Sequence, residues 1–352
     1  MLLSPSACPA TASARSTSHR FSPRSSHRLR LLTLLTALGI AACSPPESTE
    51  PEASAEVPAA EAATGMEEAG PAMGEPVEEA MDAAMESAGV AGAAALAAVL
   101  EAQPEDVQAR LVYRHPAETM AFFGIEPGMT VLEALPGGGW YTKILAAYLG
   151  TDGTVVGVDY DKSMFPLFGF MSDEQLAAKE TWPQDWSATA RGWFEVPVAG
   201  IDAAQFGAMP AEAVGTLDAA LFIRALHNMA RFEDQGGYLT TAVSEVYTAL
   251  KPGGVLGVVQ HMAPEDAPDE WASGANGYLK KSFVIAALTD AGFELVDESP
   301  INENPKDQPT TDDRVWRLPP TLSGAKDNPD LAAERTAIGE STRMTLKFRK
   351  PA

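Results

Sequence analysis

Three consecutive glycines constrain the fold of this chain more than any other feature of its sequence. They occupy positions 137–139, between residues 130–135, an apolar run typical of a buried strand, and residues 141–149, a stretch typical of a helix. Glycines at such a junction let the chain turn sharply and bring the backbone close to a ligand, while the start of the helix offers free N–H groups. The glycine turn therefore predicts an α/β fold with a ligand at this turn.

The alternation of strand and helix continues along the chain. Further strands are expected at residues 154–159, 194–198, 217–223, 255–260, 293–298 and 344–348. Helices are expected at residues 96–102, 106–123, 141–149, 238–250 and 281–291. This pattern predicts a largely parallel sheet covered on both faces, in which ligands bind beyond the carboxyl ends of the strands.

Residues around the glycine turn separate three classes of ligand that use such turns. A phosphate-binding loop would end in Gly-Lys-Ser or Gly-Lys-Thr, which is absent, and a dinucleotide fingerprint starting at Gly137 would need a third glycine where Thr142 stands. Glu133, just before the turn, would repel a pyrophosphate but suits a cationic amino-acid ligand. Asp159 ends the second expected strand, 20 residues after Gly139, where it would accept both hydroxyls of a ribose. An acid-bearing turn is the interpretation that fits best.

These residues belong to a wider set of motifs. The set comprises residues 113–119, 122–124, 131–145, 223–228, 250–254 and 347–351. With it, the chain resembles the class I S-adenosylmethionine (SAM) methyltransferases, and more narrowly a family of predicted bacterial methyltransferases, often exported, with a Pro-Gly-Gly-Gly-Trp-Tyr-Thr loop. The resemblance implies SAM as cofactor and a Rossmann-like, doubly wound sheet of seven strands, mostly parallel with an antiparallel last strand.

The resemblance assigns a cofactor-binding role to seven residues. They are Glu133, Pro136, Gly137, Gly138, Gly139, Asp159 and Asp202. Glu133 and the glycines correspond to the first SAM motif, Asp159 would bind the ribose, and Asp202 would approach the adenine amino group. The chain departs from the family pattern at Leu135, where the first glycine is usual, and at Pro136, where a small residue is usual.

Two histidines and an asparagine are the candidates for catalysis. Methyl transfer is an in-line displacement that mainly requires alignment and exclusion of water, and a base is needed only if the acceptor must lose a proton. His227 and Asn228 follow the fourth expected strand and His261 follows the fifth, at the ligand edge of the sheet. His227 is the first candidate for a general base or acceptor-orienting group. Arg224 would pair with an acid or bind an acidic substrate. No spacing of histidines and acids typical of metal ligands supports a metal site.

The first 95 residues differ in composition from the rest. Residues 1–42 hold five arginines, no acid and an apolar run at 31–42, which is the order of a secretory signal peptide. Residues 40–43 read Ile-Ala-Ala-Cys and resemble a bacterial lipobox, so Cys43 is expected to carry lipid, an incidental cysteine being the alternative. Residues 43–95 contain 12 acids and no lysine or arginine, which predicts a disordered tether with helical potential at 75–88. The methyltransferase domain is then expected over residues 96–352.

Charge and hydropathy exclude several partners. The formal charge is −23, and loss of the five N-terminal arginines would leave −28, so nucleic acid is not an expected partner. No apolar run reaches the roughly 18 residues of a spanning helix, so the expected membrane contact is the lipid anchor alone. We expect an exported, membrane-anchored lipoprotein that methylates a small molecule or an envelope component. A non-catalytic binding lipoprotein is the alternative, because SAM is made in the cytoplasm; a nicotinamide oxidoreductase is disfavoured by Thr142.

Overall fold

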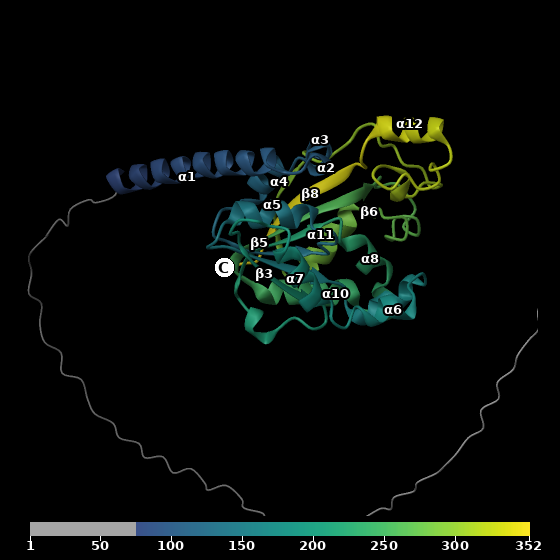
Figure 1. The fold of residues 1–352 in the computed structure, drawn as a ribbon, viewed down its shortest axis with the longest axis horizontal. Coiled ribbons are helices and arrows are strands. Elements are labelled where there is room, and N and C mark those ends of the chain that lie inside the picture. Colours follow the sequence, from purple (N-terminus) through teal and green to yellow (C-terminus); the bar gives the residue numbers. More distant parts are fainter. Residues whose placement is uncertain (1–74) are drawn as a thin grey trace, which may run out of the picture. The chain divides into compact units, whose positions relative to one another are not determined.

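The computed structural model describes residues 75–352, whose strands form one mixed sheet (Figure 1). The strands are β1 (Thr130–Ala134), β2 (Thr154–Asp159), β3 (Gly200–Gln205), β4 (Leu217–Ile223), β5 (Leu250–Ala263), β6 (Leu279–Lys280), β7 (Glu294–Ser299) and β8 (Arg343–Arg349). Their order is β3-β2-β1-β4-β5-β8-β7, with β6 paired to the end of β5. Pairing is parallel from β3 to β5, whereas β8 runs antiparallel to both of its neighbours.

This topology confirms the expected fold class, a Rossmann-like, mostly parallel sheet with an antiparallel final strand. Strands β1, β2 and β4 lie where their apolar runs predict them. The strand expected at residues 194–198 is wrong. Pro197 in that segment has no N–H to donate to a sheet, and the edge strand β3 forms instead at Gly200–Gln205, in register with β2.

Helices cover both faces of the sheet. They are α1 (Glu75–Glu101), α2 (Glu105–Gln108), α3 (Leu111–Arg114), α4 (Pro116–Phe123), α5 (Trp140–Leu149), α6 (Asp173–Ala177), α7 (Trp182–Arg191), α8 (Leu226–Arg231), α9 (Glu233–Gly236), α10 (Tyr238–Ala249), α11 (Lys281–Asp290) and α12 (Pro329–Ile338), with 3₁₀ turns η1 (Lys162–Phe168), η2 (Ala211–Ala213) and η3 (Val315–Arg317). Buried side chains of α8, α10 and α11 form a core on one face, and those of α4, α5 and α7 form a second core on the other. Figure 1 shows α6, α8 and α12 at the end of the sheet where the parallel strands terminate.

The N-terminal helix corrects the domain boundary expected at residues 95 and 96. Helix α1 runs without interruption through that position. It includes residues 75–88, where the sequence indicated helical potential, and it continues through residues 89–95, which were expected to belong to the disordered tether. Alanine-rich sequence favours a helix, and Leu96 and Leu100 fix its C-terminal part by burial in the core beside α4 and α5. Residues 43–74 of the expected tether and the expected signal segment lie outside the described residues.

The helix expected at residues 106–123 is broken into three short helices. His115 adopts a left-handed conformation with φ of 42°, and Pro116 then begins α4. The residue before a proline avoids the right-handed α region, so a continuous helix is disfavoured at His115. The spacing of apolar residues alone did not predict this break. The break turns Arg114, at the end of α3, into the protein, where it is 4% exposed. Within residues 75–352, none of the helices has the length and hydropathy needed to cross a membrane.

Candidate functional site

The carboxyl ends of β1 and β4 form the point where the chain connections reverse direction. From β1 the chain proceeds outward to β2 and β3, then crosses back to β4 on the other side of β1. Open α/β sheets bind ligands at such a point. Leu135 and Arg224 directly follow these two strands, and both have positive φ angles, 57° and 60°. This conformation costs a non-glycine residue about 1–2 kcal/mol, and such strain concentrates at functional sites.

The glycine turn joins β1 to α5 at this point, and its three glycines have different surroundings. Gly139 has φ of 78°, and a Cβ added there would lie 2.0 Å from the ring of Trp193. Gly137 also has a positive φ, 53°, and Gly138 has no atom within 4 Å of an added Cβ. Gly139 is therefore required by packing, whereas the other two present exposed backbone beyond the sheet. Pro136, which begins the turn, is buried.

A cavity of about 370 Å³ opens beside the glycine turn. It is lined by Leu135, Gly137, Asp159, Tyr160, Phe165, Phe168, Phe170, Met171, Lys179, Trp182 and Asn228, and we call it the glycine-turn cavity. Three residues singled out in the sequence meet here: Gly137, Asp159 and Asn228. Asn228 donates a hydrogen bond from Nδ2 to the Tyr160 hydroxyl at 2.9 Å. The site thus combines a backbone turn, one carboxylate and several aromatic rings.

Asp159 lies at the rim of this cavity with both carboxylate oxygens engaged. Oδ1 accepts the backbone N–H of Tyr160 at 2.9 Å, and Oδ2 lies 2.8 Å from Nζ of Lys179. Nζ of Lys179 also lies 4.2 Å from the ring centroid of Phe165. Sequence reasoning missed Lys179, because the irregular stretch that carries it gave no signal of where its side chain would reach.

Glu133 does not line the glycine-turn cavity. It pairs in register with Gly157, two residues before Asp159, and is therefore about 7 Å deeper along the sheet. Thr142 of α5 closes over it and donates its hydroxyl to Oε2 at 2.6 Å. Burial raises the pKa of Glu133 to about 7, even though the Thr142 hydrogen bond lowers it. The structure thus brings only one of the two expected acids to the rim.

Asp202 also lies away from the cavity, which corrects the expectation that it approaches adenine. It lies within β3, opposite Val156, whereas Gln205 is the residue level with Asp159. Asp202 is largely exposed and pairs with Arg191 at 3.3 Å. The error follows from the misplaced third strand, because a strand ending near residue 198 would have put Asp202 beyond its carboxyl end.

A second cavity, of about 240 Å³, lies at the carboxyl ends of β4 and β5, and His261 is within β5 rather than after it, because that strand extends to Ala263. We call it the histidine cavity; it is lined by Arg114, Arg224, His227, His261, Val315, Trp316, Leu318, Pro319, Pro320, Thr321, Glu340 and Ser341. His227 and Asn228 are adjacent on α8, so this helix contributes one side chain to each cavity. Both cavities therefore border the same short helix.

The two histidines expected at this edge lie together in the second cavity. Their ring centroids are 5.7 Å apart, and Nδ1 of His261 is 2.6 Å from the Ser341 hydroxyl. Burial, and then the nearby Arg224, lowers the pKa of His227 to about 4. Burial and the neighbouring His227 also lower the pKa of His261 well below its usual value. Both imidazoles are therefore neutral at neutral pH, and burial disfavours their protonated forms.

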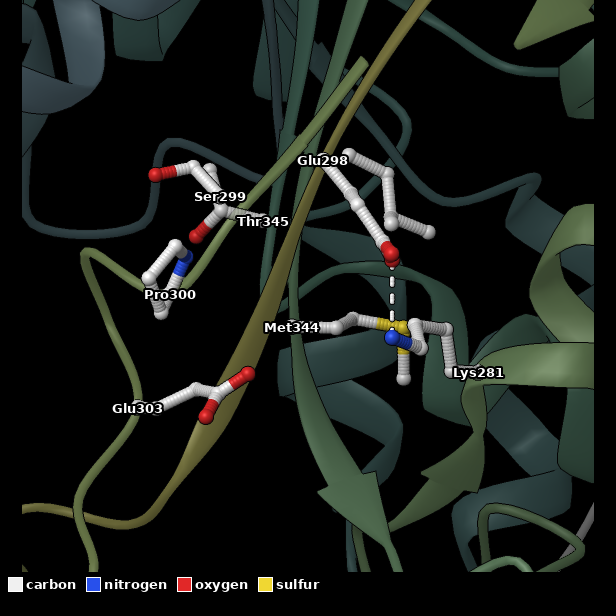
Figure 2. A pocket seen from close by; sticks show the side chains of 8 residues that line it. Lys281, Glu298, Ser299, Pro300, Glu303, Met344 and Thr345 are labelled. Carbon is white, nitrogen blue, oxygen red and sulfur yellow. Dashed lines mark hydrogen bonds and ion pairs between the residues drawn. The ribbon is translucent and has the colours of Figure 1, made fainter.

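A third cavity, of about 300 Å³, lies on the outer strands β7 and β8 (Figure 2). Glu298 pairs there with Lys281 at 2.7 Å, while the Met344 side chain lies beside them. It contains none of the residues that the sequence singled out. Within residues 75–352, the structure also has no group of three or more histidine, cysteine or acidic side chains placed to hold a metal ion.

Strand order, antiparallel β8 and the position of the glycine turn together define the class I methyltransferase fold. A family model described as protein-L-isoaspartate(D-aspartate) O-methyltransferase matches residues 101–167, a stretch that includes β1, the glycine turn and β2. It covers less than a fifth of the chain. A search of curated proteins gave no match.

Solved structures with a similar fold include two methyltransferases and a cyclase. A SAM-dependent methyltransferase from Aquifex aeolicus is 17% identical, over 59% of this chain and 93% of that chain, with a TM-score of 0.39. The 1,6-didemethyltoxoflavin-N1-methyltransferase of Burkholderia thailandensis is 15% identical, over 81% and 94%, with a TM-score of 0.38. The [4+2]-cyclase SpnF is 19% identical, over 68% and 80%, with a TM-score of 0.41. At such identities the similarity concerns the fold alone.

Proposed function

We propose that this chain is a SAM-dependent methyltransferase that binds SAM in the glycine-turn cavity. The observation that carries the proposal is the position of Asp159, which ends β2 and faces an aromatic-lined cavity beside exposed backbone of the glycine turn. The cavity volume of about 370 Å³ falls within the range of small-molecule sites. The family-model match, which includes β1, the glycine turn and Asp159, supports the same assignment.

The residues present fit the adenosine part of SAM. The carboxylate of Asp159 would accept the ribose hydroxyls, and the rings of Phe165 and Trp182 offer faces for a purine. Lys179 has to leave Asp159 for this to happen, and its long side chain lies on the connection between α6 and α7, 22% exposed. When bound, SAM supplies a methyl group that its positively charged sulfur makes electrophilic.

The histidine cavity is the place for the acceptor. It borders the same short helix, α8, as the glycine-turn cavity. Methyl transfer would require the donor methyl and the acceptor to meet beside this helix. Burial lowers the pKa of His227 to about 4, so its imidazole is neutral but weakly basic. It would orient the acceptor, or take up the proton of an acceptor that loses it readily. Its Nδ1 is buried and has no hydrogen-bond partner among residues 75–352.

Titration calorimetry with SAM on the full chain in a non-ionic detergent tests the cofactor assignment. Asp159→Asn keeps the size of the side chain but removes its charge, so the affinity for SAM should fall by about 10- to 100-fold, since a hydrogen bond to a charged group contributes about 1.5–3 kcal/mol. Asp202→Asn is the matched control and should leave the affinity unchanged. Equal affinity of both variants would refute the assignment of Asp159.

A second candidate, a non-catalytic ligand-binding lipoprotein, is favoured by one observation. Asp159 is already paired with Lys179 and Glu133 is already closed over by Thr142, so neither acid awaits a partner. Incubation of the full chain with methyl-labelled SAM and an envelope extract distinguishes the two functions. Label transferred to any component eliminates the second candidate, and SAM binding without transfer to any fraction supports it.

We further propose that the protein is exported and anchored in the membrane by lipid on Cys43. The support comes from the sequence of residues 28–43 alone, because this segment lies outside the described residues. Labelled palmitate should be incorporated by the wild-type chain, and globomycin should block processing of its precursor. A Cys43→Ala protein that still takes up label would contradict the proposal.

A further inference from the structure

Four arginines surround one carboxylate at the edge of the histidine cavity. They come from distant parts of the chain: Arg110 and Arg114 from the α2–α3 region, Arg224 after β4, and Arg343 at the start of β8. Their shortest contacts with the Glu340 carboxylate are 2.5 Å from Arg110, 3.2 Å from Arg114, 3.5 Å from Arg224 and 3.2 Å from Arg343. We call this group the arginine cluster.

The arginine cluster carries more positive charge than its own acid neutralises. Four guanidinium groups against one carboxylate leave an excess of three charges, or two when the neighbouring Glu133 is ionised as well. Arg114 and Arg343 are only 4% and 3% exposed, so water does not screen them. Burial and then the nearby Arg224 lower the pKa of Arg114 to about 9. An uncompensated buried charge is costly, and the chain keeps several of them together.

Part of the hydrogen-bonding capacity of the cluster is also unused. Arg114 Nη1 and Arg343 Nε are buried and have no hydrogen-bond partner in the described part of the chain. Both are N–H donors, and an oxyanion is a strong acceptor for such groups. Arg114 lines the histidine cavity, whereas Arg343 lies behind it in the cluster. Arg114 is held in place from the other side, because its guanidinium carbon lies 4.3 Å from the centroid of the Trp140 ring. These are the properties of a preformed anion site.

The cluster opens into the histidine cavity. Arg114 and Arg224 line the cavity at one end, while Trp316, Leu318 and Pro319 give it an apolar wall. The two neutral histidines line the same space. Its volume of about 240 Å³ corresponds to about eight water molecules. A small molecule with an anionic head and an apolar body matches this distribution of charge.

We propose that the methyl acceptor is a small anionic molecule whose carboxylate or phosphate binds Arg114 and Arg224 in the histidine cavity. This inference rests on the proposed function, because it names the substrate class of the cavity assigned there to the acceptor. The anionic group of the acceptor would balance the positive charge of the arginine cluster that Glu340 alone does not neutralise. The same contacts would place the rest of the acceptor against Trp316 and beside His227.

Ligand-observed NMR titration of the full chain in a non-ionic detergent, with benzoate as probe and benzamide as its neutral isostere, tests the proposal. Benzoate should bind at least tenfold more tightly than benzamide. Arg114→Gln and Arg224→Gln should each weaken benzoate by about tenfold, which is about 1.4 kcal/mol, and leave benzamide binding unchanged as a check of the fold. Arg191→Gln, which removes an exposed arginine outside the cavity, is the control.

Repeating the titration with saturating S-adenosylhomocysteine separates the possible sources of the anion. Benzoate affinity that does not change supports an acceptor anion. Competition would mean that the arginines hold the carboxylate of the cofactor itself, which overturns the proposal, as would equal binding of benzoate and benzamide. If S-adenosylhomocysteine does not bind but benzoate does, the proposed function fails while the anion site stands.

Discussion

Replacing Glu340 by glutamine should be among the most damaging single changes in this protein. The variant keeps the shape of the side chain but leaves four arginines without their common carboxylate. Removing one partner of a buried ion pair costs about 3–5 kcal/mol, because the remaining charge is left unpaired in the interior. Glu340 is 5% exposed and contacts all four guanidinium groups, which places it in this range. For a domain of this size the corresponding fall in Tm is about 6–20 °C.

Urea unfolding of the full chain, followed by circular dichroism, measures this loss. Burial by itself would raise the pKa of Glu340, but the four arginines hold it below 4.5. The stabilisation is therefore complete above pH 4.5, and the two proteins should converge only as the pH falls below that value. Glu298→Gln, at an exposed pair with Lys281, is the matched control and should cost less than about 1 kcal/mol. A Glu340→Gln loss no larger than that of the control would refute the reasoning.

Four further changes test the site around the glycine turn. Lys179→Met removes the cation that pairs with Asp159, so calorimetry should show SAM binding several-fold more tightly; weaker binding would mean that the lysine assists the ligand. Gly139→Ala should lower the free energy of unfolding by about 2–4 kcal/mol, because it combines left-handed strain with a clash against a tryptophan ring. Gly138→Ala should change the free energy of unfolding by less than about 0.5 kcal/mol and should weaken SAM binding. Equal effects of the two alanine substitutions on stability would contradict this account of the turn. The raised pKa of Glu133 means that its ionisation destabilises the fold as the pH rises from 4.5 to 7, by about 3 kcal/mol in all. Glu133→Gln should remove this loss, so its advantage over the wild type should appear at pH 8 and vanish at pH 4.

The sheet could be predicted from the sequence where local pattern and tertiary structure agree. The apolar runs of β1, β2 and β4 are buried on both faces, so composition alone marked them. The edge strand β3 has one neighbour, contains glycine and alanine, and owes its position to pairing with β2 rather than to its own propensity. Residues 194–198, just before it, are more apolar and so have a composition more typical of a strand. Pro197 nevertheless disfavours a strand there, because proline has no N–H to donate.

The candidate site was predictable only in part, for a geometric reason. The sequence predicted that Glu133 and Asp159 lie on neighbouring strands. The strand register, which places Asp159 at the rim and Glu133 deeper by two residues, is a property of the assembled sheet. Nothing in the sequence indicated that the arginines would gather around one carboxylate, because Arg110 and Glu340 are 230 residues apart in the chain. Arg224 drew attention as a residue that would pair with an acid or bind an acidic substrate, and the structure supplies the acid as Glu340.

A crystal structure of the protein with S-adenosylhomocysteine tests the central claim most directly. The account predicts the ribose hydroxyls within hydrogen-bond distance of the Asp159 carboxylate, the adenine among the aromatic rings of the glycine-turn cavity, and Lys179 displaced from its present partner. A ligand bound elsewhere, or a Lys179–Asp159 pair that stays intact beside the ligand, would contradict it.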